Sequence, residues 1–355
     1  MNVLIRADAS AVIGTGHIMR CLALAEQMHD KGWKVHFVCK ELPGHMLAVI
    51  RRNGFEVSGI PLDVSCADTY VDAELTKQVI RANGPFQWVI VDHYGLDEVW
   101  QRQIKSSVDH VMVIDDLANR RHHCDMLLDQ NYNPKGAARY KGLIPEGCRR
   151  LIGPSYLLLR SSFYEMRDLM DLNRDRTVRR ILLFFGGSDP TGETMKAIEA
   201  VHMIDRSSLR FDVVVGDSNP MRDQIESACR ALPNIRFHCQ VNEMASMMAL
   251  ADFSVGAGGV AMWERCFLGL PSAVVITADN QAESVEAAAS REAIWPIGMH
   301  THVKSFDIAD IILRAVESPH LLEQMSRNGL ELVDSRPGTK YNKAIDVMME
   351  VSGNG

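Results

Sequence analysis

The segment VLIRADASAVIGTGHIMRCLALAEQMHDKG (3–32) contains an apolar run, a glycine-rich turn and an amphipathic pattern, in that order. VLIRA (3–7) has the length and composition of a buried strand. MRCLALAEQMHDKG (19–32) has apolar residues at helical spacing, and the glycines between the two segments allow a tight turn. The segment therefore predicts the strand–turn–helix unit that opens a doubly wound α/β domain.

The same alternation continues along the rest of the chain. Near-continuous apolar runs separated by helical patterns are typical of a parallel sheet covered by helices on both faces. In the first half, strands are predicted at KVHFV (34–38), WVIVD (88–92), HVMVID (110–115) and MLLD (126–129). In the second half, they are predicted at RRILLFFGG (179–187), FDVVVG (211–216), NIRFHC (234–239), DFSVGAGG (252–259) and SAVVIT (272–277).

These patterns predict an α/β protein of two Rossmann-like doubly wound domains that face each other across a cleft. The expected N-terminal domain spans residues 1–165, and the expected C-terminal domain spans residues 175–335. The charged segment 165–180 suits a hinge or connection, and a last helix at 339–352 is expected to pack back on the first domain. Ligands of open parallel sheets bind beyond the carboxyl ends of the strands, so the cleft is the expected active site.

The composition narrows the possible partners. The chain has 355 residues, 46% hydrophobic and 23% charged, with a formal charge of −7, which argues against nucleic acid or an anionic membrane as a partner. Without a signal peptide or an apolar run of membrane-spanning length, we expect a cytoplasmic protein. The eight scattered cysteines form no CxxC motif and are expected to be reduced thiols.

The turn Ile13–Arg20 carries the main candidate for catalysis. Gly14 and Gly16 would let the backbone approach a ligand, and the start of the helix favours an anion. His17 lies in the first helical turn, where the helix dipole disfavours imidazolium and keeps the ring available as a base. Arg20 shares its helical face and could reach the ligand. The alternatives are a structural turn that carries a histidine by chance, and a solvated surface arginine.

Glycine turns in the second half predict a phosphate site. Gly187 and Ser188 follow one strand, and Gly258 and Gly259 follow another, so that two helix starts could hold one pyrophosphate. Glu264 could accept hydrogen bonds from both ribose hydroxyls, while Asn280 and Gln281 after SAVVIT could contact sugar hydroxyls. The alternatives are ordinary helix caps, Ser188 or Asp189 among them, and a glutamate that compensates the helix dipole.

Other polar motifs are weaker signals. Acidic residues end two strands of the first half, in VDHYGLD (91–97) and VIDDLA (113–118), and are expected to face the same cleft or to cap helices. The histidines at 122, 123, 300 and 302 lack partners at metal-site spacing, so we expect solvated loop histidines and no metal. GxSxG is absent, and no nucleophilic serine or cysteine is indicated.

Ten segments in register resemble the UDP-2,4-diacetamido-2,4,6-trideoxy-β-L-altropyranose hydrolase family of pseudaminic acid biosynthesis. They are RADAS, IGTGHIMR, VDHYGLD, VIDDLANR, CDMLLDQN, LIGPSYLLLR, FFGGSDP, GAGG, WERCFLGLP and ADNQ. The chain is similar, more distantly, to MurG-like glycosyltransferases. The resemblance implies a glycosyltransferase-B-type fold, a link to flagellin glycosylation, and cleavage of a UDP-sugar at the anomeric carbon with inversion and without cofactor or metal.

The resemblance also implies individual roles. His17 is then the general base, Tyr94 and Asn280 contact the substrate, and Glu264 holds the ribose. The sequence departs from the family pattern at Val260-Ala261-Met262, where relatives often have Ser-Thr-Thr, so backbone amides are expected to carry the pyrophosphate alone. It also departs at His93, where relatives often have serine, which leaves the sugar stereochemistry open.

The chemistry of a nucleotide diphosphate fits a site of this kind. A glycosidase needs a carboxylic acid to protonate a poor leaving group, whereas UDP leaves readily and needs only charge stabilisation and one base. The expected partners are therefore a UDP-sugar substrate and the product UDP. Two alternatives stay open: a UDP-sugar-dependent glycosyltransferase, in which an acceptor hydroxyl replaces water, and a non-catalytic nucleotide-sugar binding protein.

Overall fold

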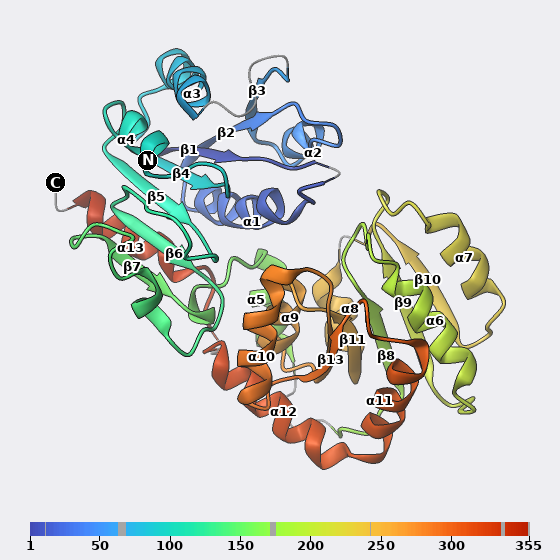
Figure 1. Cartoon of the computed structure of the whole chain (residues 1–355). Coiled ribbons are helices and arrows are strands. Elements are labelled where there is room, and N and C mark those ends of the chain that lie inside the picture. Colours follow the sequence, from blue (N-terminus) through green and yellow to red (C-terminus); the bar gives the residue numbers. More distant parts are fainter. Residues whose placement is uncertain (11, 63–68, 171–174, 242, 335–337, 354–355) are drawn as a thin grey trace. The chain divides into compact units, whose positions relative to one another are not determined.

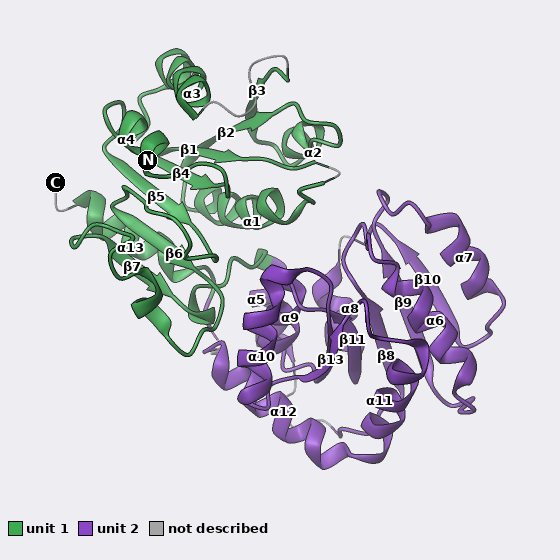
Figure 2. Cartoon of the chain, viewed as in Figure 1, with its two compact units in different colours: residues 1–161, 340–355 green, residues 162–339 purple. Residues whose placement is uncertain are grey.

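The strands of the chain form two parallel sheets, one of seven strands and one of six, in a computed structural model (Figure 1). The structure describes residues 1–10, 12–62, 69–170, 175–241, 243–334 and 338–353. The chain divides into two compact units, which we call unit 1 (residues 1–161 and 340–355) and unit 2 (residues 162–339) (Figure 2). Each unit contains one of the sheets. The predicted α/β class with two doubly wound sheets is confirmed.

Unit 1 has the strand order β3-β2-β1-β4-β5-β6-β7. Its strands are β1 (Asn2–Ala7), β2 (Lys34–Lys40), β3 (Glu56–Ile60), β4 (Trp88–Asp92), β5 (His110–Ile114), β6 (Met126–Asp129) and β7 (Arg149–Ile152). Its helices are α1 (Gly16–Asp30), α2 (Leu47–Arg52), α3 (Thr69–Asn83), α4 (Glu98–Lys105) and α13 (Lys343–Gly353), with 3₁₀ turns η1 (Gly136–Tyr140) and η2 (Pro154–Tyr156). The order reverses between β1 and β4, and ligands of such sheets bind at that point.

Unit 2 repeats this topology with the order β10-β9-β8-β11-β12-β13, which reverses between β8 and β11. Its strands are β8 (Arg180–Phe184), β9 (Arg210–Val215), β10 (Ile235–Cys239), β11 (Phe253–Ala257), β12 (Ser272–Ile276) and β13 (Trp295–Met299). Its helices are α5 (Ser161–Leu169), α6 (Glu193–Met203), α7 (Arg222–Arg230), α8 (Met244–Leu250), α9 (Val260–Phe267), α10 (Ala282–Ser290), α11 (Ser305–Glu317) and α12 (Pro319–Leu332), with η3 at Asp279–Gln281.

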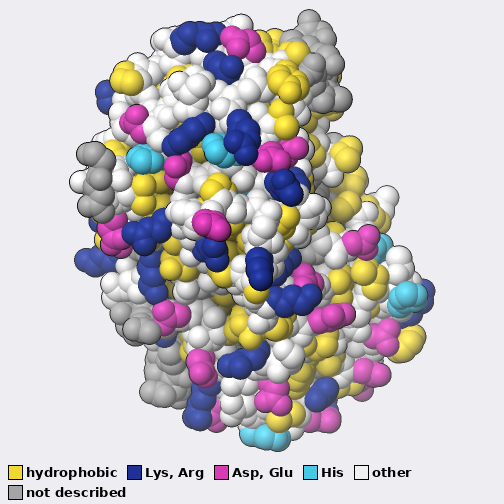
Figure 3. All heavy atoms as spheres, turned by 60° about the vertical axis from the view of Figure 1, so that its left-hand side comes forward, with side chains coloured by type: hydrophobic (Ala, Val, Ile, Leu, Met, Phe, Trp, Pro, Cys, Tyr) yellow, Lys and Arg dark blue, Asp and Glu magenta, His cyan; other side chains and the backbone are white. Residues whose placement is uncertain are grey.

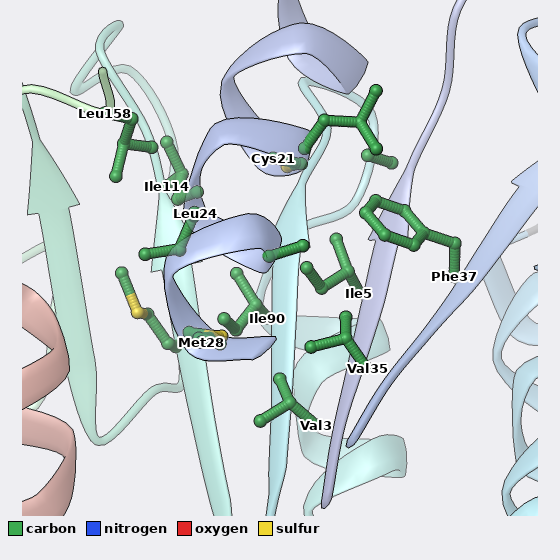
Figure 4. Packing of buried hydrophobic residues seen from close by; sticks show 14 of the residues in the cluster. Val3, Ile5, Cys21, Leu24, Met28, Val35, Phe37, Ile90, Ile114 and Leu158 are labelled. Carbon is green, nitrogen blue, oxygen red and sulfur yellow. The ribbon is translucent and has the colours of Figure 1, made fainter. Parts of the chain in front are cut away.

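Alternating residues of the unit 1 strands enter two separate cores, because successive side chains of a strand point to opposite faces. On one face Ile5 and Ile90 pack against α1, and Figure 4 shows Leu24 and Met28 of that helix beside them. On the other face Leu4 and Val91 pack with residues of α3 and α4. The central strands are therefore apolar on both sides, which explains the near-continuous apolar runs of the sequence.

The last helix, α13, is part of unit 1 although it follows unit 2 in the sequence. Ala344, Ile345 and Met348 are fully buried in the same core as α1. Asn342, just before the helix, is also buried, and its side chain donates hydrogen bonds to the carbonyl oxygens of Tyr156 and Leu157. The chain thus closes back on its first domain by apolar burial and by hydrogen bonds to the η2 turn.

Three strands were not predicted from the sequence: β3, β7 and β13. Each contains polar, glycine or proline residues and is only partly buried, so it lacks the apolar run that marked the other strands. The predicted connecting segment 165–180 begins inside a helix, since α5 ends at Leu169.

Charged side chains of both signs lie on the surface of the molecule. On the face in Figure 3, basic and acidic side chains are interspersed. Among the described residues, no helix has the length and apolar character needed to span a bilayer. The seven cysteines within the described ranges are free thiols.

The position of α13 in the core of unit 1 makes a stability prediction. Ile345→Ala should lower the free energy of unfolding by about 2–5 kcal/mol, because the side chain is fully buried and its removal leaves a cavity. Met349→Ala, on the exposed side of the same helix, should change it by less than about 0.5 kcal/mol. Urea unfolding followed by circular dichroism measures both changes. Equal unfolding midpoints for the two variants would contradict the burial of α13 in the core of unit 1.

Candidate active site

The candidate base, His17, lies in the first turn of α1, directly after the glycine turn that follows β1. Gly14 has a positive φ of 81°, which a side chain would strain, and its N–H donates to the carbonyl oxygen of Ser10 (2.9 Å). Gly16 is the first residue of the helix. The His17 side chain is 10% exposed, so the ring is largely enclosed but not cut off from solvent.

Asp92 holds the His17 ring. Asp92 is the last residue of β4 and is completely buried, and its Oδ1 lies 2.6 Å from His17 Nδ1. The carboxylate oxygen is the nearer partner of Nδ1, since Arg20 Nη2 lies 3.2 Å away, and a lone pair on Nδ1 would face that oxygen. We therefore assign the proton to Nδ1, which donates it to Asp92. In the neutral ring the other nitrogen, Nε2, is then the acceptor. This is the tautomer that a general base requires.

Arg20 completes the group from the next turn of α1. Its Nε donates to Asp92 Oδ2 and its Nη2 donates to Asp92 Oδ1, both at 2.6 Å. Arg20 is buried, so the alternative of a solvated surface arginine is wrong. Burial alone would raise the pKa of Asp92, but the charge of Arg20 and the hydrogen bonds from Arg20 and His17 hold it well below its usual value. Asp92 therefore stays ionised.

Tyr94 lies beside this group, two residues after β4. Its ring meets the His17 ring edge-on, with the centroids 4.7 Å apart, and its hydroxyl donates to Asp116 Oδ1 (2.8 Å). Asp116 Oδ2 also lies 3.4 Å from Arg20 Nη1. Burial, followed by the charge of Asp116, raises the pKa of Tyr94, so the phenol remains a neutral donor. His17, Arg20 and Tyr94, predicted separately, form one cluster.

Acidic residues end four neighbouring strands of this sheet, and each is paired with an arginine. We call Asp8, Asp92, Asp115 and Asp129 the strand-end acids. They follow or end β1, β4, β5 and β6. The shortest nitrogen–oxygen distances are Arg6–Asp8 2.5 Å, Arg20–Asp92 2.6 Å, Arg120–Asp115 2.7 Å and Arg139–Asp129 2.8 Å.

His93 and His122 also contact strand-end acids. His93 Nε2 lies 3.3 Å from Asp8, and its Nδ1 accepts from the N–H of Gly95. His122 is buried with its Nδ1 3.0 Å from Gln101 Nε2, which corrects the expectation of a solvated loop histidine. Among the described residues, no group of three or more His, Cys, Asp or Glu side chains is placed to hold a metal ion.

In unit 2 the turn after β8 is built from glycine and an aspartate cap. Gly187 and Ser188 are half-buried in this turn. The Gly187 carbonyl accepts from Gly216 N–H (2.8 Å), and a Cβ on Gly216 would lie 2.8 Å from that oxygen. Asp189 caps α6, because its carboxylate accepts from the N–H groups of Glu193 (3.0 Å) and Thr194 (2.8 Å). Asp189 is therefore a helix cap, as one of the two interpretations of this turn predicted.

The turn after β11 leads directly into α9. Gly258 has no room for a side chain, since a Cβ there would lie 2.4 Å from Val285 Cγ2. Gly259 is the N-cap of α9 and has no side chain to cap the helix. The first N–H groups of a helix lack partners inside it, so this start can donate to an anion. Met262 is fully buried, and Val260 and Ala261 offer no hydroxyl groups.

The three remaining candidates lie near this turn in the chain or in space. Glu264 is half-buried in α9. Asn280 is exposed in η3, and Gln281 follows it. Gln281 Oε1 accepts from the N–H and the hydroxyl of Thr277, at 3.0 and 3.1 Å, and Nε2 lies 3.7 Å from the position of a Cβ on Gly259. Its amide therefore holds the turn after β12 and lies beside the glycine turn after β11.

Sequence reasoning missed Asp92 and Asp116 as site residues, and it did not indicate that Arg265 is buried. Asp92 and Asp116 lie in strand-end segments that the sequence marked, but their contacts with Arg20 span 72 and 96 residues and depend on the pairing of β1 with β4. Arg265 lies in the WERC segment, and its burial is a property of the fold alone.

The histidine group makes a spectroscopic prediction. In neutral His17, nitrogen-15 shifts should show a protonated Nδ1 and an unprotonated Nε2, because Asp92 accepts from Nδ1. Asp92→Asn should shift this equilibrium toward the Nε2-protonated form. The His17→Gln variant identifies the signal, and an Nε2-protonated ring in the unsubstituted protein would contradict the geometry.

Comparison with known proteins gives relatives but no matching family model. The chain is 29% identical over 248 residues to UDP-2,4-diacetamido-2,4,6-trideoxy-β-L-altropyranose hydrolase of Campylobacter jejuni, covering 70% of this chain and 81% of that protein. It is 24% identical to spore coat polysaccharide biosynthesis protein SpsG of Bacillus subtilis, covering 95% of both. It is also 24% identical to uncharacterized protein MJ1062 of Methanocaldococcus jannaschii, over 80% of this chain but 57% of that protein.

Solved structures show the same fold at low sequence identity. MurG of Acinetobacter baumannii has a TM-score of 0.63 at 12% identity, with 100% of this chain and 99% of that chain covered. The UDP-GlcNAc 2-epimerase of Neisseria meningitidis has a TM-score of 0.63 at 14% identity, with both chains fully covered. The chain therefore has the glycosyltransferase-B type of fold, and the predicted resemblance to the UDP-2,4-diacetamido-2,4,6-trideoxy-β-L-altropyranose hydrolases is confirmed as a similarity of sequence.

Proposed function

We propose that the chain hydrolyses a UDP-sugar at the anomeric carbon and releases the free sugar and UDP, with inversion. Unit 1 supplies the base and unit 2 holds the UDP. The observation that carries the proposal is the His17 ring at the start of α1, whose Nδ1–H is bound by the buried Asp92 carboxylate. The sequence similarity to the Campylobacter hydrolase supports the reaction and the sugar class.

In the proposed reaction, His17 Nε2 takes a proton from water as the water oxygen bonds to the anomeric carbon. The bond from that carbon to the diphosphate oxygen breaks, and its electron pair leaves with UDP. Asp92 keeps the ring in the required tautomer and stabilises the imidazolium that forms. UDP needs no protonation by a general acid, because the negative charge on its phosphate is held by backbone N–H groups.

Unit 2 offers two glycine turns for the diphosphate. They follow β8 and β11, the central pair of strands where the strand order reverses. The turn after β11 enters α9 through Gly259, so its first amides can bind phosphate oxygens without a competing side-chain cap. The roles proposed here are phosphate binding for Gly187, Ser188, Gly258 and Gly259, ribose binding for Glu264, and sugar contacts for Tyr94, Asn280 and Gln281.

For the substrate we propose a UDP-linked 2,4-diacetamido-2,4,6-trideoxy sugar and a place in pseudaminic acid biosynthesis. The name of the Campylobacter relative supports this sugar. The Bacillus relative is named for polysaccharide biosynthesis, which supports a nucleotide-sugar pathway more generally.

The reaction and its base can be tested together. Incubated with the UDP-sugar and no acceptor, the protein should release UDP and free sugar, and in ¹⁸O-water the label should enter the sugar. His17→Asn should lower the turnover number by about 10²–10⁴-fold, the usual contribution of a general base. Its affinity for UDP should stay within a few-fold, since the diphosphate is bound by unit 2.

The matched control is His29→Asn, an exposed histidine in the last turn of the same helix, which should keep full turnover. Proton NMR reports product and anomer, and mass spectrometry reports the label. Release of UDP only when an acceptor is added would indicate a glycosyltransferase instead. Tight UDP-sugar binding with no release would indicate a binding protein.

The ribose assignment predicts a change in selectivity. A carboxylate that accepts from both ribose hydroxyls should favour UDP over 2′-deoxy-UDP, and Glu264→Ala should reduce that preference by about tenfold or more. Glu286→Ala, an exposed glutamate of α10, is the control and should leave the preference unchanged. Isothermal titration with the two nucleotides measures the effect, and an unchanged ratio in Glu264→Ala would remove this role.

A further inference from the structure

Arg265 is a fully buried arginine in α9, at 0% exposure. Its Nη2 donates to the carbonyl oxygen of Ala257 (2.9 Å), the last residue of β11. The side chain therefore runs back from the second turn of the helix to the strand that precedes it. This places a guanidinium group directly behind the glycine turn 258–259.

The guanidinium also lies next to the end of β8. A Cβ on Gly256 would lie 2.2 Å from the carbonyl oxygen of Phe184 and 2.7 Å from Arg265 Nη1. The carbonyl group and the guanidinium group therefore both lie against Gly256. Phe184 is the last residue of β8, and Gly256 pairs with it in the sheet. Both glycine turns of unit 2 thus begin beside the same guanidinium group.

Arg265 differs from the buried arginines of unit 1 in its partners. Arg6 and Arg20 each bind buried carboxylates. Among the described residues, Arg265 forms no ion pair, and its Nε and Nη1 have no hydrogen-bond partner. Burial lowers the pKa of Arg265 to about 10, with weak opposing effects of Cys266 and Glu264, so the group is still charged at neutral pH.

A buried charge without a partner is costly, because protein solvates an ion poorly compared with water. The cost falls when an anion binds nearby, since charges interact strongly across a few ångströms of protein that excludes water. The start of α9, four to six residues before Arg265, is the point at which unit 2 can present backbone donors to an anion.

We propose that Arg265 is a buried countercharge for the diphosphate of the nucleotide, acting across the turn after β11 without touching the ligand. The inference rests on the proposed function, in which unit 2 binds UDP. Its chemical consequence is a preference for ligands of higher negative charge: UDP above UMP, and UMP above uridine. It also favours departure of UDP, because the bridging oxygen gains negative charge as its bond to the sugar breaks.

A purely structural role for Arg265 makes a different prediction. If its only contribution were the hydrogen bond to Ala257, its loss would distort the turn and weaken the binding of all three ligands equally. The dependence on ligand charge therefore separates the two roles.

The experiment measures the affinities of uridine, UMP and UDP by isothermal titration in the full chain. Arg265→Met should weaken UDP binding by about tenfold or more, UMP binding by less, and uridine binding by less than about twofold. Arg265→Lys, which keeps the charge, should retain most of the preference for UDP. The control is Arg206→Met, which removes a positive charge from an exposed side chain of the same unit and should leave all three affinities unchanged.

Equal weakening of the three ligands in Arg265→Met would overturn the countercharge role while leaving the UDP site in place. If the unsubstituted protein binds UDP no better than uridine, the proposed UDP site fails, and the inference fails with it. If Arg265→Met does not fold, Arg265→Gln gives the same comparison, because it also removes the charge but keeps a polar side chain.

Discussion

The buried carboxylate of Asp92 is the interaction on which the geometry of unit 1 depends. It ends a central strand with no exposure to solvent, so its charge must be balanced by donors from the protein. Among the described residues, the side chains that donate to it come from the first turns of α1: His17, Arg20 and the Cys21 thiol. Apolar packing alone tolerates small rotations and shifts of a helix, whereas these directional bonds set the position of the helix start against β4. The orientation of the candidate base follows from the need to compensate this one charge.

The carboxyl ends of the strands carry different residues in the two sheets. The order of six strands is nevertheless the same in both, and β7 is an additional strand of unit 1. In unit 1 the strand-end acids are each bound to an arginine. The arginine does not fully offset burial at Asp129, since burial raises the pKa of that carboxyl group to about 6. In unit 2 the corresponding central strands end in glycine turns, with the buried charge of Arg265 behind them. The first edge therefore holds side chains in place, and the second carries the helix start to which we assign diphosphate binding. The residues at the strand ends make this difference, since the topology is common to both.

Sequence patterns correctly predicted the features that depend on interactions between neighbouring residues. Apolar runs located the buried strands, and the glycine turn placed His17 at a helix start, because both features come from neighbouring residues. The edge strand β13 (WPIGM) was missed, since a half-buried strand with proline and glycine has no such signal. The partner of His17 could not be predicted, because several acidic residues end strands and only the register that pairs Ala7 with Asp92 selects one of them. Gln281 was predicted as a sugar contact, but its oxygen also holds a turn, which its sequence context did not indicate.

Charged side chains of both signs surround His17. With the ring neutral, Arg20 contributes one positive charge, while Asp92 and Asp116 contribute two negative charges, and the neutral Tyr94 phenol donates to Asp116. The cluster thus carries one net negative charge at rest. In the proposed reaction, the proton taken from water would bring this cluster to neutrality, so no net charge would form in a largely buried site. Asp116, which contacts neither ring nitrogen, belongs to this group through its hydrogen bonds from Arg20 and Tyr94.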